Sequence, residues 1–148
     1  MAAEVTTAQA STQGNSDVRN MFFLKGRNYI ITGGGQGIGF AMTRAICQMG
    51  GNVAVLDLRD SPVGEFKSLS NEYDVKTEYL QTDVTKEQSL TNSFDKAIEK
   101  LGSVDGLVTA AGIAINKPFL EQTWEEVNRL QQVNVWSDGG LNLLDSLC

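Results

Sequence analysis

Short apolar runs alternate along the chain with longer segments in which apolar residues recur every three or four positions. The short runs have the length and β-branched content of buried strands, and the longer segments have the period of amphipathic helices. This pattern predicts strands at 28–31, 53–56, 77–81 and 104–109, and helices at 37–50, 62–73, 86–101 and 124–134.

Several of these helices carry end signals. Ser61-Pro62 combines an N-cap residue with a proline at the first helical position, and Gly50-Gly51 is expected to end the first helix. The segments 85–88 and 123–126 read Thr-Lys-Glu-Gln and Thr-Trp-Glu-Glu, and each fits a capping box. The faces predicted to be buried are Ile38, Ala41, Ala45, Ile46 and Met49 in the first helix, and Leu90, Phe94, Ala97 and Leu101 in the third.

The strand–helix order, repeated along the chain, predicts the fold class. The connections between strands are about a dozen residues or longer, which indicates parallel strands with crossover helices on both faces. Right-handed crossovers and a switch point between the first and fourth strands give the sheet order 3-2-1-4. We therefore expect an α/β protein with a partial Rossmann-like, doubly wound parallel sheet, β-α-β-α-β-α-β-α.

Composition divides the chain into three segments. Residues 1–20 are rich in Ala, Thr, Gln, Ser and Asn, lack the regions of a secretory signal, and are expected to form a disordered leader. Residues 21–135 carry the strand–helix pattern and are expected to form one folded unit. Residues 136–148 include Asp-Gly-Gly, which would break a helix, and are expected to be a divergent tail.

The charge and cysteine content argue against several classes of function. Twelve Lys and Arg against eighteen Asp and Glu give a net charge of −6 without basic clusters, so neither nucleic acid nor an anionic membrane is an expected partner. The apolar runs are shorter than the roughly 18 residues that span a bilayer. With no His and two cysteines outside any Cys-x-x-Cys pair, no zinc site or disulfide framework is expected, and a cytoplasmic location fits best.

A glycine-rich loop between the first strand and the first helix is the strongest functional signal. It reads Thr-Gly-Gly-Gly-Gln-Gly-Ile-Gly at 32–39. Glycines permit positive φ and let backbone amides approach a pyrophosphate, and the helix N-terminus adds about half a positive charge there. The alternative is a simple strand-to-helix turn. The predicted cofactor-binding residues of this loop are Thr32, Gly33, Gly35, Gln36, Gly37, Ile38 and Gly39.

Asp57 ends the second strand and is the next candidate. A carboxylate at this place can accept hydrogen bonds from both hydroxyls of an adenosine ribose and repels a 2′-phosphate, which favours NAD over NADP. Arg59 favours the opposite choice, because a basic side chain here could hold the 2′-phosphate. A turn-forming role of Asp57 in Asp-Leu-Arg-Asp is the alternative.

Over residues 24–135 the chain resembles the short-chain dehydrogenase/reductase family. The family loop Thr-Gly-x-x-x-Gly-x-Gly is matched by 32–39, and the family's Asp-Val beside the adenine ring is matched by 83–84. Its Asn-Asn-Ala-Gly motif is matched only in part by 109–112, where both Asn positions are replaced, and Asn134 corresponds to the Asn of the catalytic tetrad. The resemblance adds Asp83, Val84, Ala110, Ala111 and Gly112 as cofactor-binding residues and Asn134 as a catalytic residue.

The resemblance implies an NAD(P)-dependent oxidoreductase that acts on a small-molecule alcohol or ketone and is a homo-oligomer in the full-length family. Phe-x-Leu-Lys-Gly at 22–26 and Val-Thr-Ala-Ala-Gly-Ile at 108–113 are similar to fungal reductases of polyols and ketose sugars. A polyol, a ketose or a related secondary alcohol or ketone is therefore the expected substrate.

The chain departs from the family in the residues that carry its chemistry. The family uses a Ser and a Tyr followed four residues later by a Lys. Tyr29, Tyr73 and Tyr79 lack a Lys at that distance, so the sequence contains no Tyr-x-x-x-Lys. Without it no proton donor is poised near neutral pH. The chain as written is therefore expected to be C-terminally truncated and inactive.

Two other functions fit parts of the pattern. A non-catalytic nucleotide-binding or interaction module derived from the same fold would bind without turnover. A methyltransferase also uses a glycine loop and an acidic residue after the second strand, but the glycine spacing and Asp83-Val84 argue against it.

Overall fold

The computed structural model describes residues 21–137. The predicted leader and all but the first two residues of the predicted tail lie outside the described residues. No helix between residues 21 and 137 has the length and apolarity that a bilayer-spanning segment requires.

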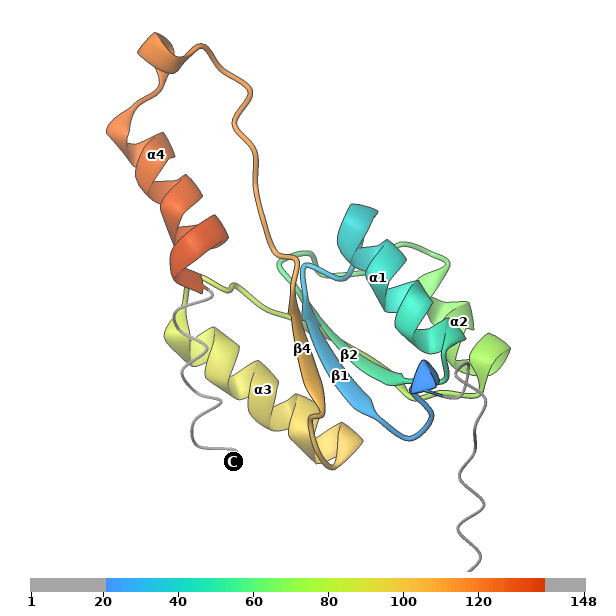
Figure 1. Ribbon diagram of the computed structural model, residues 1–148. Helices are drawn as coiled ribbons and strands as arrows, with labels where there is room; N and C mark the ends of the chain where they lie inside the picture. The colour runs from blue at the N-terminus through green and yellow to red at the C-terminus, as the bar shows by residue number, and fades with distance from the viewer. Residues whose placement is uncertain (1–20, 138–148) are drawn as a thin grey trace, which may run out of the picture.

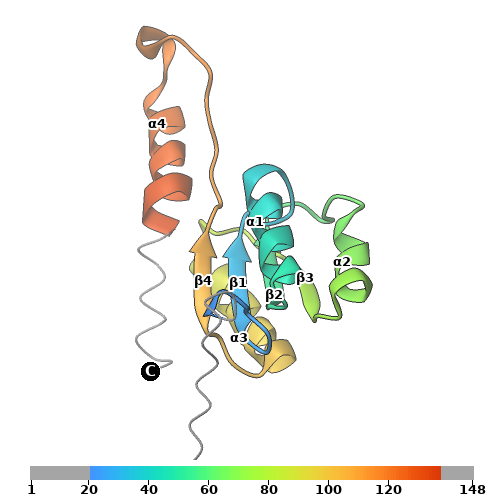
Figure 2. The ribbon, with the colours of Figure 1, turned by 45° about the vertical axis from the view of Figure 1, so that its right-hand side comes forward.

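A parallel sheet of four strands forms the centre of the fold and confirms the predicted topology (Figure 1). The register pairs Ile30 of the first strand with Ala54 on one side and Leu107 on the other. The carboxyl ends of all strands therefore lie at one edge of the sheet, where the following loops converge (Figure 2). The strands are β1 (Asn28–Thr32), β2 (Asn52–Asp57), β3 (Thr77–Gln81) and β4 (Gly106–Thr109), in the order β3-β2-β1-β4.

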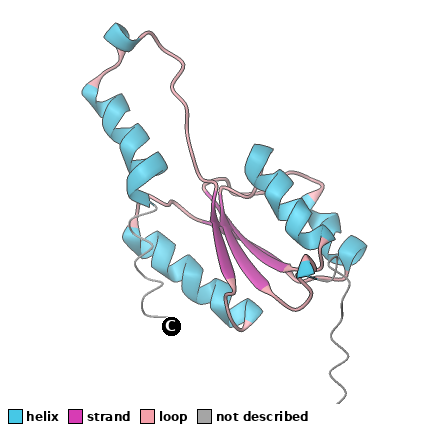
Figure 3. Cartoon of the chain, viewed as in Figure 1, coloured by secondary structure: helices cyan, strands magenta, loops and turns pink. Residues whose placement is uncertain are grey.

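Helices cover both faces of the sheet. α1 (Gly37–Gln48) and α2 (Phe66–Tyr73) lie on one face, and α3 (Glu87–Leu101) lies on the other (Figure 3). Because successive strand residues point to opposite faces, Ile30 packs toward α3 and Ile31 toward α1 and α2. The predicted apolar face of α3 is confirmed, since Leu90, Phe94, Ala97 and Leu101 are all buried.

The last helices stand apart from the sheet (Figures 1 and 2). After β4 the chain extends to a 3-10 turn, η2 (Phe119–Glu121), and returns through α4 (Trp124–Gln131) and a π-helical segment, η3 (Gln132–Trp136). The predicted capping box of α4 is confirmed: the Glu126 amide donates to Thr123 Oγ1 at 3.2 Å, and the Thr123 amide donates to Glu126 Oε2 at 2.8 Å.

The predicted buried face of α1 is wrong for Ile38, Ala41 and Ala45, which are exposed, although Ile46 packs against the core. Ile38 is 78% exposed, and the helix buries Gly39, Phe40, Thr43 and Cys47 instead. The glycine loop sets this rotation, because a Cβ on Gly39 would lie 2.1 Å from the carbonyl oxygen of residue 33. The Thr43 hydroxyl also donates to the carbonyls of residues 34 and 39, which holds the first turns against the loop.

The predicted start of α2 is also wrong. Ser61 does not cap a helix, because its hydroxyl donates to Asp60 Oδ1 at 2.9 Å, and α2 begins only at Phe66. The segment between them is held to the glycine loop, where the Val63 amide donates to the Gly35 carbonyl at 3.1 Å. Because of this tertiary contact, α2 begins at a later residue than the local sequence signals predict.

The capping box predicted for α3 does not form. The Thr85 hydroxyl donates to Asp83 Oδ1 at 2.6 Å, and the Gln88 side chain donates to Asn92 Oδ1 at 2.8 Å, so neither reaches the partner that a capping box requires. Asp83, which precedes the predicted box, accepts the hydrogen bonds of the Thr85 hydroxyl and amide instead.

Candidate functional site

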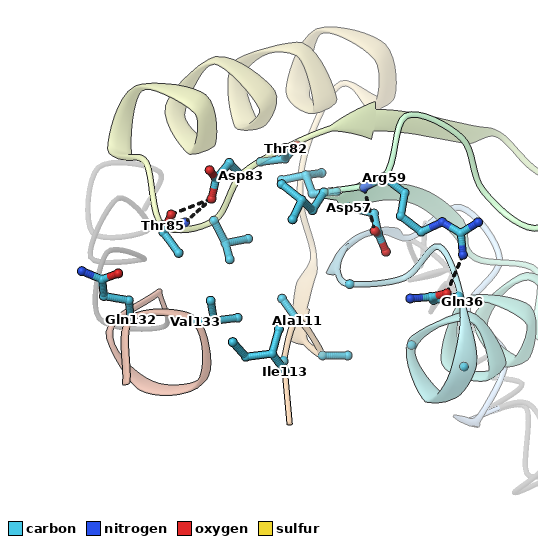
Figure 4. A pocket seen from close by; sticks show the side chains of 18 of the residues that line it. Gln36, Asp57, Arg59, Thr82, Asp83, Thr85, Ala111, Ile113, Gln132 and Val133 are labelled. Carbon is cyan, nitrogen blue, oxygen red and sulfur yellow. Dashed lines mark hydrogen bonds between the residues drawn. The ribbon is translucent and has the colours of Figure 1, made fainter. Parts of the chain in front are cut away.

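A pocket of about 740 Å³ opens at the carboxyl-terminal edge of the sheet. It lies where β1 and β4 are neighbours and their following segments leave toward opposite faces, an arrangement that opens a crevice for ligands in α/β sheets. Its walls are the glycine loop, the end of β2, the loop after β3, the segment after β4, and the region where α4 meets η3 (Figure 4).

The glycine loop is packed so closely at Gly33 and Gly39 that neither position can hold a side chain. Gly33 has a φ of 69°, and a Cβ at this position would lie 2.6 Å from the backbone nitrogen of Ala111. Together with the contact of Gly39 described above, this brings β1, α1 and the segment after β4 into direct backbone contact. Glycine is therefore required at these positions by the packing of the protein itself, and the predicted approach of the loop amides to a pyrophosphate stays a prediction.

Gly37 serves a different purpose, since it opens α1 beside the pocket. It has a φ of 55°, and an added Cβ would meet no atom within 4 Å. The Phe40 amide donates to the Gln36 carbonyl at 3.0 Å, so the amides of 37–39 precede the hydrogen bonds of the helix itself. These amides, at the positive end of the helix dipole and on the pocket wall, suit a phosphate or pyrophosphate.

Asp57 lies on the pocket wall next to this loop and is 7% exposed. Its Oδ2 accepts from the Gly35 amide at 2.9 Å, and its Oδ1 accepts from the Arg59 amide at 3.1 Å. A carboxylate offers about four acceptor positions, so Asp57 retains the capacity to bind further hydroxyl donors. The turn-forming role and the ligand-binding role of this side chain are therefore compatible.

Tyr79 supports the same wall from β3. Burial, followed by the charge of Asp57, raises the pKa of Tyr79 to about 12. The hydroxyl therefore stays protonated at neutral pH and donates to the Arg59 carbonyl at 3.1 Å. Tyr79 is thus a hydrogen-bond donor that fixes the backbone rather than a proton-transfer group.

Asp83 closes the pocket on the side of α3. It accepts from both the hydroxyl and the amide of Thr85, and Lys86 lies 3.1 Å from its Oδ2. The hydrogen bond from the Thr85 hydroxyl, more than any other cause, lowers the pKa of this carboxyl. Asp83 is therefore a charged group that both lines the pocket and organises the first turn of α3.

Asn134 does not line the pocket but holds one of its walls. Its Oδ1 accepts from the Ile113 amide at 2.9 Å, and its Nδ2 donates to the Ile113 carbonyl at 3.0 Å. The side chain therefore binds both backbone polar groups of one residue, and links η3 to the segment after β4. The structure gives Asn134 a positioning contact, and its catalytic role stays a prediction.

Most of the predicted cofactor-binding residues meet at this pocket, with two exceptions. Thr32 is 3% exposed and connects β1 to the segment after β4, where its Oγ1 accepts from the Ala111 amide at 3.4 Å. Gly35 lies behind Asp57. The residues that line the pocket as predicted are Gly33, Gln36, Gly37, Ile38, Gly39, Asp57, Asp83, Val84, Ala110, Ala111 and Gly112.

Sequence reasoning missed the wall contributed by α4 and η3. These residues carry no motif, and they reach the pocket only because the chain returns from its projecting turn. Arg59, which the sequence presents only as a rival to Asp57, lines the same wall. The lining residues that were missed are Leu56, Leu58, Thr82, Thr85, Ile113, Arg129, Gln132 and Val133.

Comparison with a family model gives a match over residues 27–138, described as short chain dehydrogenase. The chain is 38% identical over 110 residues to L-2,3-butanediol dehydrogenase of Corynebacterium glutamicum, which covers 73% of this chain and 43% of that protein. It is 32% identical over 110 residues to a sorbose reductase of Schizosaccharomyces pombe, again with 73% and 43% covered. The chain thus spans less than half the length of these relatives.

Solved structures share the fold. The NADPH-dependent 3-quinuclidinone reductase of Rhodotorula rubra superposes with a TM-score of 0.76 at 31% identity, over 92% of this chain and 52% of that one. A hydroxysteroid dehydrogenase of Escherichia coli gives a TM-score of 0.76 at 32% identity, over 84% and 53%.

Proposed function

Because the chain belongs to the short-chain dehydrogenase family of NAD(P)-dependent oxidoreductases, we propose that its pocket binds a nicotinamide dinucleotide. The observation that carries the proposal is the convergence, on one pocket wall, of the start of α1 and the Asp57 carboxylate. The first suits a pyrophosphate and the second suits the hydroxyls of an adenosine ribose.

The residues present fit the parts of such a ligand in a definite order. The pyrophosphate would lie against the amides of 37–39, the adenosine ribose against Asp57, and the adenine against Asp83-Val84. The nicotinamide end would then lie toward Ala111-Gly112. The side-chain-free surface at Gly37, where no atom lies within 4 Å of an added Cβ, leaves room for the phosphates. Asp57 favours NAD over NADP, since its carboxylate would repel the 2′-phosphate of the NADP ribose.

The substrate class that we propose is a polyol, a ketose or a related secondary alcohol or ketone. The names of two relatives, a butanediol dehydrogenase and a sorbose reductase, support this class. Nicotinamide chemistry supplies a hydride to a carbonyl or accepts one from an alcohol. Within this chain, Asn134 would hold Ile113 and so keep the substrate side of the pocket in place.

We further propose that the 148 residues by themselves bind the dinucleotide without turning over a substrate. The basis is the lack of a Tyr-x-x-x-Lys in this sequence, together with the raised pKa of Tyr79 and its engagement with the backbone of Arg59. A measurable oxidation or reduction of a polyol or ketose by this chain, abolished by Asn134→Ala, would contradict this part of the proposal.

The binding proposal is tested by calorimetric titration of the chain with NAD and with S-adenosylmethionine. Gly37→Asp places a carboxylate at the proposed pyrophosphate position and is expected to weaken NAD binding by about tenfold or more through charge repulsion. An Asp near a helix N-terminus does not oppose the helix dipole, so α1 should still form. Gly26→Asp is the matched control, because Gly26 also has a positive φ, 81°, with open space around it.

Binding of S-adenosylmethionine in place of NAD would contradict the proposal. An equal loss of NAD affinity in Gly37→Asp and Gly26→Asp would show that the loss is a general effect of the added charge and not a property of the pocket.

A further inference from the structure

A hydrogen bond between two side chains crosses the pocket rim beside Asp57. Arg59 Nη1 donates to Gln36 Oε1, and both residues line the pocket (Figure 4). Gln36 belongs to the glycine loop, and Arg59 follows β2. The contact therefore joins the proposed pyrophosphate region to the proposed ribose region at the exposed rim of the pocket.

The backbone of Arg59 is held firmly, whereas its side chain is not. Its amide donates to Asp57 Oδ1 at 3.1 Å, and its carbonyl accepts from the Tyr79 hydroxyl at 3.1 Å. The guanidinium, in contrast, is exposed, and Gln36 is its hydrogen-bond partner among the described residues. A change in the position of the guanidinium thus requires the loss of one exposed hydrogen bond and no movement of the pocket wall.

We propose that Gln36 sets the balance between NAD and NADP by holding the Arg59 guanidinium against the glycine loop. The proposal rests on the dinucleotide site described above. While Gln36 holds Arg59, the Asp57 carboxylate governs the ribose and a 2′-phosphate is repelled. When Arg59 leaves Gln36, its planar donors pair with the 2′-phosphate and offset that repulsion.

The strength of the contact determines how far this balance can shift. An exposed hydrogen bond to a neutral amide contributes little, so Arg59 can exchange partners. Gln36→Leu removes the acceptor and should favour the ligand with a 2′-phosphate. Gln36→Glu replaces the neutral acceptor by a carboxylate that forms an ion pair with Arg59, and should favour the ligand without it. The two substitutions thus have opposite expected effects.

The test is calorimetry of the 148-residue chain with NAD and with NADP, which differ only in the 2′-phosphate. The measured quantity is the ratio of the two dissociation constants. Gln36→Leu should shift this ratio about threefold toward NADP, and Gln36→Glu about threefold or more toward NAD, as expected for one exposed contact. Gln88→Leu is the control, since Gln88 bonds to Asn92 on α3 away from the pocket.

Arg59→Leu identifies the group through which Gln36 acts. In this background, Gln36→Leu should no longer change the ratio, and the shift caused by Gln36→Glu should be reduced to the direct repulsion of the phosphate. If NAD binds but the ratio is the same in the unmodified chain and in Gln36→Leu, the inference is wrong while the dinucleotide site stands. A shift caused by Gln36→Leu that persists without Arg59 also overturns it. Absence of NAD binding overturns the dinucleotide site and this inference together.

Discussion

At the scale of single residues, Asp57 combines two tasks. Its carboxylate bridges the amides of Gly35 and Arg59, so it fixes the relation between the glycine loop and the end of β2. The same carboxylate lines the pocket and has acceptor capacity left for the hydroxyls of the proposed ligand. A substitution at this position therefore affects both stability and ligand preference, and the two effects can be measured separately.

Asp57→Ala should narrow the preference for NAD over NADP, because it removes the charge that repels a 2′-phosphate. It should also lower the free energy of unfolding by about 1–3 kcal/mol, since two amides lose a buried acceptor. Paired titrations with NAD and NADP, together with urea denaturation, measure both changes. Tighter binding of NADP than NAD by the unmodified chain would contradict the role given to Asp57.

Gly39 is a residue at which the fold admits no side chain. Gly39→Ala should lower the free energy of unfolding by about 3 kcal/mol or more, because its Cβ would overlap the carbonyl oxygen of Gly33, at 2.1 Å. Gly64→Ala is the matched control, with no atom within 4 Å of the added Cβ. Similar midpoints of urea denaturation for the two variants would show that the loop relaxes around the methyl group.

At the scale of elements, the start of α3 shows how a nearby acceptor replaces an expected cap. Asp83 accepts from the hydroxyl and the amide of Thr85, and its own amide donates to Ser89 Oγ at 3.0 Å. The loop and the first turn of the helix are thus joined by hydrogen bonds in both directions. Gln88, which a capping box would require, faces Asn92 instead.

Stability at low pH should depend on this arrangement. The pKa of Asp83 is lowered in the folded protein, chiefly by the Thr85 hydroxyl, so the stabilisation is present above the ordinary carboxyl pKa of about 3.9 and is lost as the pH falls through the lower folded value. Thr85→Val removes the hydroxyl donor. Its destabilisation should therefore be larger at pH 7 than at pH 2 in urea denaturation.

Gln88→Leu provides the control for this experiment, because Gln88 takes no part in the contacts of Asp83. It should leave the pH dependence unchanged. A loss of stability in Thr85→Val that is equal at both pH values would show that the hydroxyl does not act through the Asp83 charge.

At the level of the entire protein, β4 forms one edge of the sheet and β3 forms the other. Among the described strands β4 pairs only with β1, although Leu107 and Val108 pack against the two apolar layers. Its other side presents N–H and C=O groups that can pair with a strand of another copy. The side chains of β4 are thus packed, whereas the backbone groups along its outer edge have no strand to pair with among the described residues.

The 148-residue chain is therefore expected to associate or to be poorly soluble. Size-exclusion chromatography should show species larger than a monomer. Thr109→Lys places a charge on the β4 edge and should increase the monomeric fraction. Asn92→Lys makes the same charge change at an exposed position of α3 and should not increase it. A sharp monomeric peak of the unmodified chain, with a cooperative thermal transition, would rule out this association.

Periodic and local signals in the amino-acid sequence were sufficient to predict the strands and most of the helices. Apolar runs such as 53–56, buried on both faces, identified the strands, and the spacing of Leu90, Phe94 and Ala97 identified the buried face of α3. The glycine loop and Asp57 could be placed in one site because the carboxyl ends of parallel strands share an edge of the sheet. The sheet order followed from the same rules of connection.

The neighbours of several small and polar groups depend on how the chain folds and cannot be read from the sequence. α1 rotates to bury Gly39 because the carbonyl of Gly33 lies against it, which a count of apolar positions does not reveal. Arg59 has a plausible partner in a 2′-phosphate, but it bonds to Gln36, a residue of the glycine loop that the fold brings beside it. Periodicity reports whether a side chain is buried, but competition among hydrogen-bond partners depends on distances that exist only after the chain has folded.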